Sequence, residues 1–288
     1  MRLGPAIGLS LALAAAPLDA DPARLLGSFD WDGAAPWFGG WSGLELSADG
    51  REMVAISDRG TLLRGHLRRV GDRIAAVERI STTQLKDTSG RPLDDRSRDA
   101  EGLALLPEGG VAISFEGAHR LDLYLGDSDP ARALPRPPVA GALPFNGGFE
   151  ALAVDEEGRL YAVAEDHLDD RGRIPVFLWD GQAWSRPFTL EKRGRFLPVG
   201  ADFGPDGRFY LLERAFGMTG FRSRLRRWTL TEGGATGEAT LLQTGAHDNL
   251  EGLAIWRDEA GGLRATMISD DNFLPIQRSE IVEYALPE

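Results

Sequence analysis

The chain has 288 residues, of which 42% are hydrophobic and 26% are charged, so it can bury a full core, and disordered and fibrous classes are excluded. Its net charge of −12 would repel an extended polyanion, so we expect no nucleic-acid partner. The absence of cysteine excludes disulfides, thiolate metal sites and cysteine nucleophiles, which leaves oxygen and imidazole as metal ligands.

The first twenty residues have the pattern of a secretory signal peptide. Arg2 precedes an apolar stretch at residues 7–16, and small residues surround Ala16 and Ala20. Pro17 and Asp19 interrupt this stretch, and it is shorter than the roughly 18 apolar residues of a membrane span. We therefore expect a signal peptide over residues 1–20, a mature domain over residues 21–288, no membrane span, and a secreted or periplasmic protein.

The rest of the chain repeats one pattern five times. The repeats are WSGLELSADGREMVAISDRG, AEGLALLPEGGVAISFEG, FEALAVDEEGRLYAVAED, VGADFGPDGRFYLLER and LEGLAIWRDEAGGLRATMISDD. The equivalent residues Ser42, Glu101, Glu150, Val199 and Glu251 are 59, 49, 49 and 52 residues apart. Each repeat alternates apolar residues on both sides of a Gly-containing or Asp-containing turn, which predicts a β-hairpin.

A third short apolar run follows every hairpin, and a fourth follows some of them, which is the period of a β-propeller blade. We therefore predict an all-β propeller of four-stranded antiparallel blades, with five blades favoured and six as the alternative. Residues 25–31 precede the first hairpin and would supply the outer strand of the last blade, so that the N-terminal and C-terminal strands close the ring. A closed ring has no open sheet edge, and we expect a monomer.

Acidic residues recur where this fold predicts one rim of the central channel. The first strands begin at Glu101, Glu150 and Glu251, just after Asp99, Asp248 and Asn249. The second strands end at Asp58, Glu116, Glu165, Glu213, Asp270 and Asp271. Crowded carboxylates raise one another's pKa or bind a cation, and an all-oxygen site favours Ca²⁺. The alternative is that the repeated glutamates hydrogen-bond to backbone amides of the adjacent blade.

Basic residues are also expected beside these acids. Arg59 and Arg214 directly follow strand-end carboxylates, and arginine can bind a phosphate or carboxylate with two parallel hydrogen bonds. His247 and His119 are expected near the rim, where either could act as an acid or a base. Intramolecular ion pairs are the alternative role of the arginines. The G-x-S-x-G, Walker, H-E-x-x-H and dinucleotide-binding motifs are absent from the sequence.

In their order, the segments AISDRG, RDAEGLA, GFEALAVDEEGRLYAVAED, DNLEGLAIW and ISDDNF resemble the phytase-like domain family called "esterase-like activity of phytase". The resemblance extends over roughly residues 41–286. It implies a secreted or periplasmic β-propeller that hydrolyses phosphate or carboxylic esters. The D-D-P-A and N-N-F-D-type segments of calcium-dependent β-propeller phytases are absent, which does not favour phytate as the substrate.

Two functions follow from these observations. The first is a metal-assisted hydrolase of a small ester or phosphorylated substrate. Its expected Ca²⁺ ligands are Asp58, Glu101, Glu116, Glu150, Glu165, Glu213 and Asp271, and its expected reacting groups are Glu251, Asp270, Arg59, Arg214 and His247. The second is a non-catalytic envelope protein that binds a ligand or a protein partner on the same rim.

Overall fold

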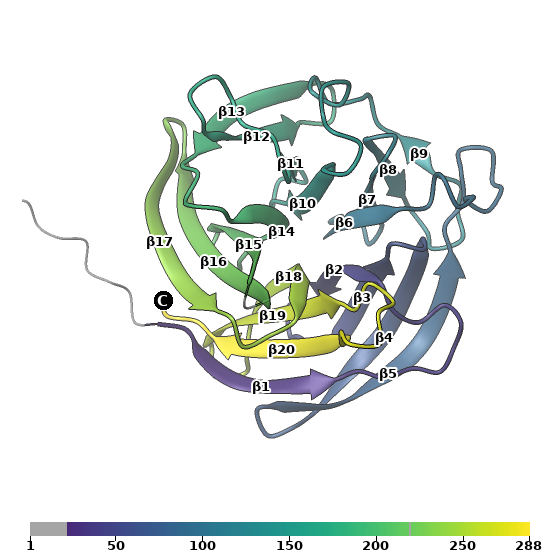
Figure 1. The fold of residues 1–288 in the computed structure, drawn as a ribbon, viewed down its shortest axis with the longest axis vertical. Helices are drawn as coiled ribbons and strands as arrows, with labels where there is room; N and C mark the ends of the chain where they lie inside the picture. The colour runs from purple at the N-terminus through teal and green to yellow at the C-terminus, as the bar shows by residue number, and fades with distance from the viewer. Residues whose placement is uncertain (1–21, 219) are drawn as a thin grey trace, which may run out of the picture.

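The structure is a computed structural model that describes residues 22–218 and 220–288, and these form a ring of five β-sheets around a channel (Figure 1). The predicted signal peptide lies outside the described residues. Each sheet is a blade of four antiparallel strands, which confirms the predicted five-bladed propeller, and the alternative of six blades is wrong. No helix in the described ranges is long and apolar enough to cross a membrane.

The strands of each blade follow one another in the chain, apart from the last blade. Blade 1 contains β2 (Trp41–Leu46), β3 (Glu52–Ser57), β4 (Thr61–Val70) and β5 (Arg73–Gln84). Blade 2 contains β6 (Ala100–Leu105), β7 (Val111–Phe115), β8 (Arg120–Tyr124) and β9 (Arg132–Ala133). Blade 3 contains β10 (Phe149–Val154), β11 (Leu160–Ala164), β12 (Ile174–Trp179) and β13 (Trp184–Leu190). Blade 4 contains β14 (Leu197–Phe203), β15 (Phe209–Gly217), β16 (Gly220–Thr231) and β17 (Gly234–Thr244).

Blade 5 closes the ring. It contains β18 (Asn249–Arg257), β19 (Leu263–Asp270), β20 (Glu280–Ala285) and, as its outer strand, β1 (Arg24–Asp30). In Figure 1 the purple β1 runs alongside the yellow β20, and the pairing extends from Arg24 opposite Ala285 to Asp30 opposite Glu280. This confirms the predicted closure by the N-terminal and C-terminal strands.

The hydrophobic core is divided into five layers, one between each pair of neighbouring blades. Each blade therefore buries both of its faces. For example, Leu212 of blade 4 packs in the same layer as Met267 of blade 5. This explains why an inner strand such as β2 is buried along its whole length.

The inner strands β2, β6, β10, β14 and β18 approach one another closely around the channel, and glycine permits this approach. A Cβ on Gly200 would lie 2.3 Å from the carbonyl oxygen of Glu251, and one on Gly252 would lie 2.6 Å from the backbone nitrogen of Leu44. Beside Ser42, Glu150 and Glu251 the free space is only about 10 Å³. The channel is therefore nearly closed in its middle and opens at two separate mouths.

Candidate functional site

Each inner strand contains a β-bulge near its start, at the repeated position. The pairing register shifts around Ser42, Glu101, Glu150, Val199 and Glu251. A bulge interrupts the alternation of a strand and redirects the side chain of the extra residue. This is how three blades place a glutamate at the same mouth of the channel, whose surrounding residues we call the acidic rim.

The second strand of each hairpin returns to this rim and adds further carboxylates. Asp58 and Glu116 directly follow β3 and β7, Glu165 follows β11, and Asp270 ends β19. Their side chains are partly or fully buried, although all carry an ionisable group. The hairpin topology thus brings carboxylates from four blades to one end of the channel.

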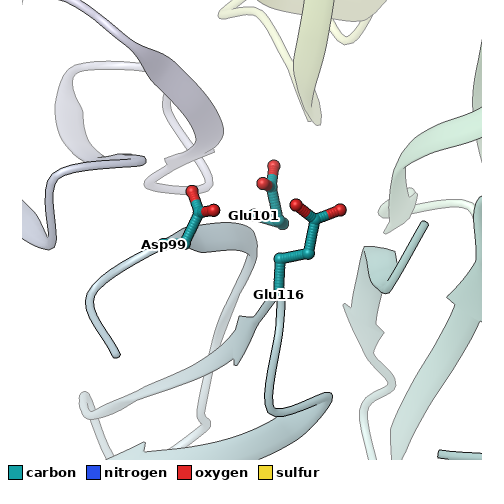
Figure 2. Close-up of side chains that lie close together, drawn as sticks. All are labelled: Asp99, Glu101 and Glu116. Carbon is teal, nitrogen blue, oxygen red and sulfur yellow. The ribbon is translucent and has the colours of Figure 1, made fainter. Parts of the chain in front are cut away.

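Three of these acids form a group that fits a metal ion. Asp99, Glu101 and Glu116 each offer one carboxylate oxygen, and the three oxygens lie within 4.8 Å of one another. Figure 2 shows that the three side chains reach a common space from the start of β6 and the end of β7. Oxygens bound to Ca²⁺ at roughly 2.3–2.6 Å can be up to about 5 Å apart across the ion, so one Ca²⁺ can contact all three.

Crowding and burial shift the pKa values of the rim acids upward. Burial, followed by the negative charges of Asp270 and Asp99, raises the pKa of Asp58 to about 7. Burial raises the pKa of Asp270 to about 6. The pKa of Glu101 rises well above its usual value because of burial and the neighbouring charges of Glu150 and Glu251. These directions indicate a cluster with more negative charge than its surroundings neutralise.

Arg214 neutralises one side of the rim. Its Nη2 donates to Glu165 Oε1 at 2.8 Å and lies 3.9 Å from Glu150 Oε2. Its Nη1 donates to Asn249 Oδ1 at 2.8 Å and to Glu251. Both terminal nitrogens of Arg214 are therefore engaged with rim oxygens, as in the intramolecular ion pair considered above. Burial opposes its charge, but the three glutamates raise the pKa of Arg214 above its usual value.

On the opposite side of the rim, no basic residue of the described chain forms an ion pair with Asp58, Asp99, Glu101 or Glu116. The Oδ1 atom of Asp58 is fully buried and has no hydrogen-bond partner within the described part of the chain. A buried carboxylate oxygen without a donor is costly unless a proton or a cation reaches it. A hard cation fits this side of the rim, because it could neutralise the group of Asp99, Glu101 and Glu116 as well as the orphaned oxygen of Asp58.

The structure does not bring Glu213 to the rim acids, although it was expected among the metal ligands. Its side chain on β15 is 0% exposed and accepts hydrogen bonds from Arg226 at 2.5 and 2.9 Å and from Arg224 at 2.6 Å. Both arginines lie on the adjacent strand β16, where Arg224 is directly opposite Glu213. Two guanidinium groups contact both oxygens of Glu213, so the structure places this residue in a buried ion pair.

His247 is also separate from the rim acids. It hydrogen-bonds to the Tyr284 hydroxyl at 2.7 Å, and its other ring nitrogen is 3.5 Å from Glu280. Burial acts to raise the pKa of Glu280, but hydrogen bonds from His247, the Asp248 amide and Ser28 lower it to about 2. The histidine therefore belongs to a polar group between β18 and β20. His119 is buried, and burial lowers its pKa.

Asp271 and Arg59 organise the loops above the rim. Asp271 accepts hydrogen bonds from the amides of Gly40 and Phe273, both at 3.0 Å, and from the Ser279 hydroxyl at 3.0 Å. The Arg59 guanidinium lies over the Phe273 ring, 3.3 Å from its centroid. Both oxygens of Asp271 are thus occupied by loop contacts.

Asp99 and Asn249 belong to the site, although the sequence placed them at the rim without a role as metal ligand or reacting group. Asp99 completes the three-carboxylate group, and Asn249 Nδ2 donates to Glu251 Oε1 at 2.8 Å. Both stand two positions before a repeated glutamate, as D-x-E and N-x-E. That shared spacing is the signal that could have identified them.

A closed ring of five four-stranded blades with an acidic channel mouth defines this chain as a β-propeller with a candidate cation site. The chain belongs to the Phytase-like family, described as "Esterase-like activity of phytase", which matches residues 36–273. No curated protein matches the sequence.

Two solved structures share the propeller architecture. The α-L-arabinofuranosidase PaAbf62A from Podospora anserina, in complex with cellotriose, has a TM-score of 0.58 and 11% sequence identity, with 93% of this chain and 98% of that chain covered. The gluconolactonase XC5397 from Xanthomonas campestris has a TM-score of 0.51 and 14% identity, with 97% and 99% covered. At these identities the similarity concerns the fold alone.

Proposed function

We propose that this protein is an exported, calcium-assisted hydrolase of phosphate or other esters that acts at the acidic rim. The observation that carries the proposal is the convergence of Asp99, Glu101 and Glu116 at the acidic rim, where Asp58, which is affected by the charge of Asp99, has an orphaned oxygen. Membership of the Phytase-like family supports the ester chemistry. The signal-peptide pattern of residues 1–20 supports export.

The donor set favours a hard cation. All three groups offer carboxylate oxygens, the ligands that Ca²⁺ prefers, and its six to eight coordination positions leave room for water and substrate. When bound there, Ca²⁺ would polarise the ester and stabilise negative charge as it develops. Extracellular proteins commonly bind calcium in the 10⁻⁴ to 10⁻³ M range, which suits an exported protein.

Other rim residues would accept a proton from water and hold the glutamates in position. Asp58 and Asp270 have pKa values of about 7 and about 6, near the range in which a carboxylate can accept a proton from an attacking water at neutral pH. Arg214 holds Glu165 and Glu251 in place and limits repulsion on the other side of the mouth. Residues 39–40 and 271–273 form the loops that surround the entrance near Asp58.

The test separates metal binding from catalysis. We would follow the thermal midpoint of the chain from Asp21 onward during a calcium titration in calcium-stripped buffer, and then assay p-nitrophenyl phosphate and p-nitrophenyl acetate with saturating calcium. We expect a saturable rise in the midpoint, because a ligand that binds only the folded state stabilises it. Glu101→Gln should abolish the rise, whereas Glu232→Gln, which removes an exposed carboxylate far from the rim in sequence, should keep it.

Each outcome has a distinct meaning. A calcium response with ester turnover that Glu101→Gln removes supports the hydrolase. A calcium response without turnover of either ester would favour the non-catalytic binding protein. The absence of a response to calcium, magnesium and manganese would overturn the metal site.

A further inference from the structure

The channel has a second mouth on the face opposite the acidic rim, where the inner strands end. A cavity of about 520 Å³ lies there, a size typical of small-molecule sites. Its walls include Leu46, Leu105, Val154 and Phe203, which end β2, β6, β10 and β14. Because the middle of the channel is nearly closed, this cavity is separate from the acidic rim.

Two acids enter this cavity at equivalent positions of two blades. Three residues after the repeated glutamate, blades 2, 3 and 5 have alanine, as in the E-G-L-A of Glu251 to Ala254. Blade 1 has Glu45 and blade 4 has Asp202 at the same position. Blades 4 and 1 flank blade 5 in the ring, so the two acids lie on either side of the small Ala254. The two blades without a glutamate at the acidic rim are the two with an acid at the second mouth.

Both acids are buried, and the donors to their carboxyl groups are uncharged backbone amides. Glu45 is 6% exposed and Asp202 is 9% exposed. Glu45 Oε1 accepts from the Leu105 amide at 3.3 Å, and Asp202 Oδ2 accepts from the Ile255 amide at 2.6 Å, each on the inner strand of the next blade. The Phe203 amide is a further donor to Asp202, and both acids line the cavity.

The charges around these acids leave them without a counter-ion. Burial and the charge of Asp202 raise the pKa of Glu45 well above its usual value, and burial raises the pKa of Asp202 to about 7. Arg159 is the only basic residue among the described residues of the lining, and it pairs with Asp155 at 2.6 Å and Glu157 at 3.0 Å. A ligand that neutralises these two carboxylates must therefore bring positive charge and hydrogen-bond donors.

We propose that this cavity binds a small organic ammonium ion, with its charged group between Glu45 and Asp202 and its apolar part against Phe203 and Ile255. An ammonium group carries a positive charge and three N–H donors, which suits two neighbouring carboxylates without a basic partner in the described ranges. The leucine, valine, isoleucine and phenylalanine side chains of the lining suit an apolar body and disfavour a bare metal ion, which would keep its water. This site is independent of the function proposed for the acidic rim.

Isothermal titration with benzylammonium chloride tests the proposal, and benzyl alcohol is the uncharged control of the same shape. We expect one site per chain at neutral pH, and binding of benzyl alcohol about tenfold weaker or less. Glu45→Gln and Asp202→Asn should each weaken benzylammonium binding about tenfold or more, because each removes a charge-assisted hydrogen bond. Glu232→Gln changes an exposed carboxylate that is not part of the cavity lining, and it should leave benzylammonium binding unchanged.

Two controls keep the result interpretable. The new side chains of Glu45→Gln and Asp202→Asn would keep an oxygen that can accept from the Leu105 and Ile255 amides, so we expect both variants to fold. If one variant does not fold, the second measurement follows the amide NMR shifts of Leu105 and Ile255 in the wild-type protein as benzylammonium is added. Glu101→Gln must leave benzylammonium binding intact, because a loss would place the ammonium at the acidic rim. No saturable binding, equal binding of the alcohol, or binding that survives both cavity substitutions would overturn the proposal.

Discussion

Arg214 Nη2 and Glu165 Oε1 are 2.8 Å apart, and this contact connects blade 4 to blade 3 across the acidic rim. The guanidinium group also contacts Glu251 of blade 5, so one side chain links three blades. Its position explains how Glu150, Glu165 and Glu251 can share one channel mouth.

Replacing Arg214 with Gln should destabilise the protein by about 3–5 kcal/mol near pH 8, since it leaves buried carboxylates without a partner. The loss should be smaller at pH 5, where those carboxylates can be protonated. Urea denaturation at both pH values measures this. Arg222→Gln, at an exposed position of β16, is the control and should change stability little. An equal loss at both pH values would contradict the electrostatic role.

The stability of the calcium-free protein should fall as the pH rises from about 5 to about 8. Asp58 and Asp202 have folded-state pKa values of about 7, above the roughly 3.9 of an unfolded aspartate, so the folded state binds more protons in this window. Their contribution is complete below about pH 4 and is lost as the pH passes their folded pKa values. Glu280 has a lowered folded-state pKa and so has the opposite effect on the pH dependence: it stabilises the folded state above its unfolded pKa, and this stability is lost only as the pH falls toward 2.

Denaturation curves at several pH values, with and without calcium, provide the measurement. Calcium should recover stability mainly above about pH 7, where the rim carboxylates are ionised. A calcium-free protein whose stability increases steadily from pH 5 to pH 8 would show that these carboxyl groups ionise without cost.

Replacing Glu213 with Gln should lower stability by about 3–5 kcal/mol, because it leaves the buried Arg224 and Arg226 without their charged partner. It should not remove the calcium-dependent rise in thermal midpoint, in contrast to Glu101→Gln. Thermal melts of both variants with and without calcium check this. Loss of the calcium response in a folded Glu213→Gln protein would return Glu213 to the list of candidate ligands.

Adding a methyl group between the inner strands should lower the stability of the folded protein. Gly252→Ala places a Cβ 2.6 Å from the Leu44 backbone nitrogen, so the inner strands of blades 5 and 1 must separate, and we expect a loss of about 1–3 kcal/mol. Gly141→Ala is the matched control, because no atom lies within 4 Å of its added Cβ. Equal stability of the two variants in urea would mean that the inner strands can move apart freely.

The sequence predicted the ring because every repeat has the same strand, turn and strand pattern. Each hairpin is built from strands that follow one another in the chain, so the pattern within one repeat is sufficient to predict its hairpin. It also predicted the location of Glu101, Glu150 and Glu251, because equivalent positions of a repeat lie at equivalent places in the ring. The short β9 of blade 2 has only two residues, which explains why no fourth apolar run is visible in that repeat.

The contacts that the sequence did not reveal involve partners that are distant in sequence or on a neighbouring strand. Glu213 occupies a strand-end position like the other acids, but Arg224 lies opposite it on β16, and two arginines within that buried strand were a signal of an ion pair. The contact of Asp271 with the Gly40 amide spans 231 residues, and no local pattern reveals it.

The pairing of β1 with β20 also constrains the order of folding. Even the closest partners in this ladder, Asp30 and Glu280, are 250 residues apart in the chain. The hairpins of blades 1 to 4 need only local contacts, whereas blade 5 requires the two ends of the sequence to meet, and such non-local pairing is slow to form. The layers on both sides of blade 5 should therefore consolidate last, and until β1 is in place the outer edge of β20 remains open to pairing with another chain.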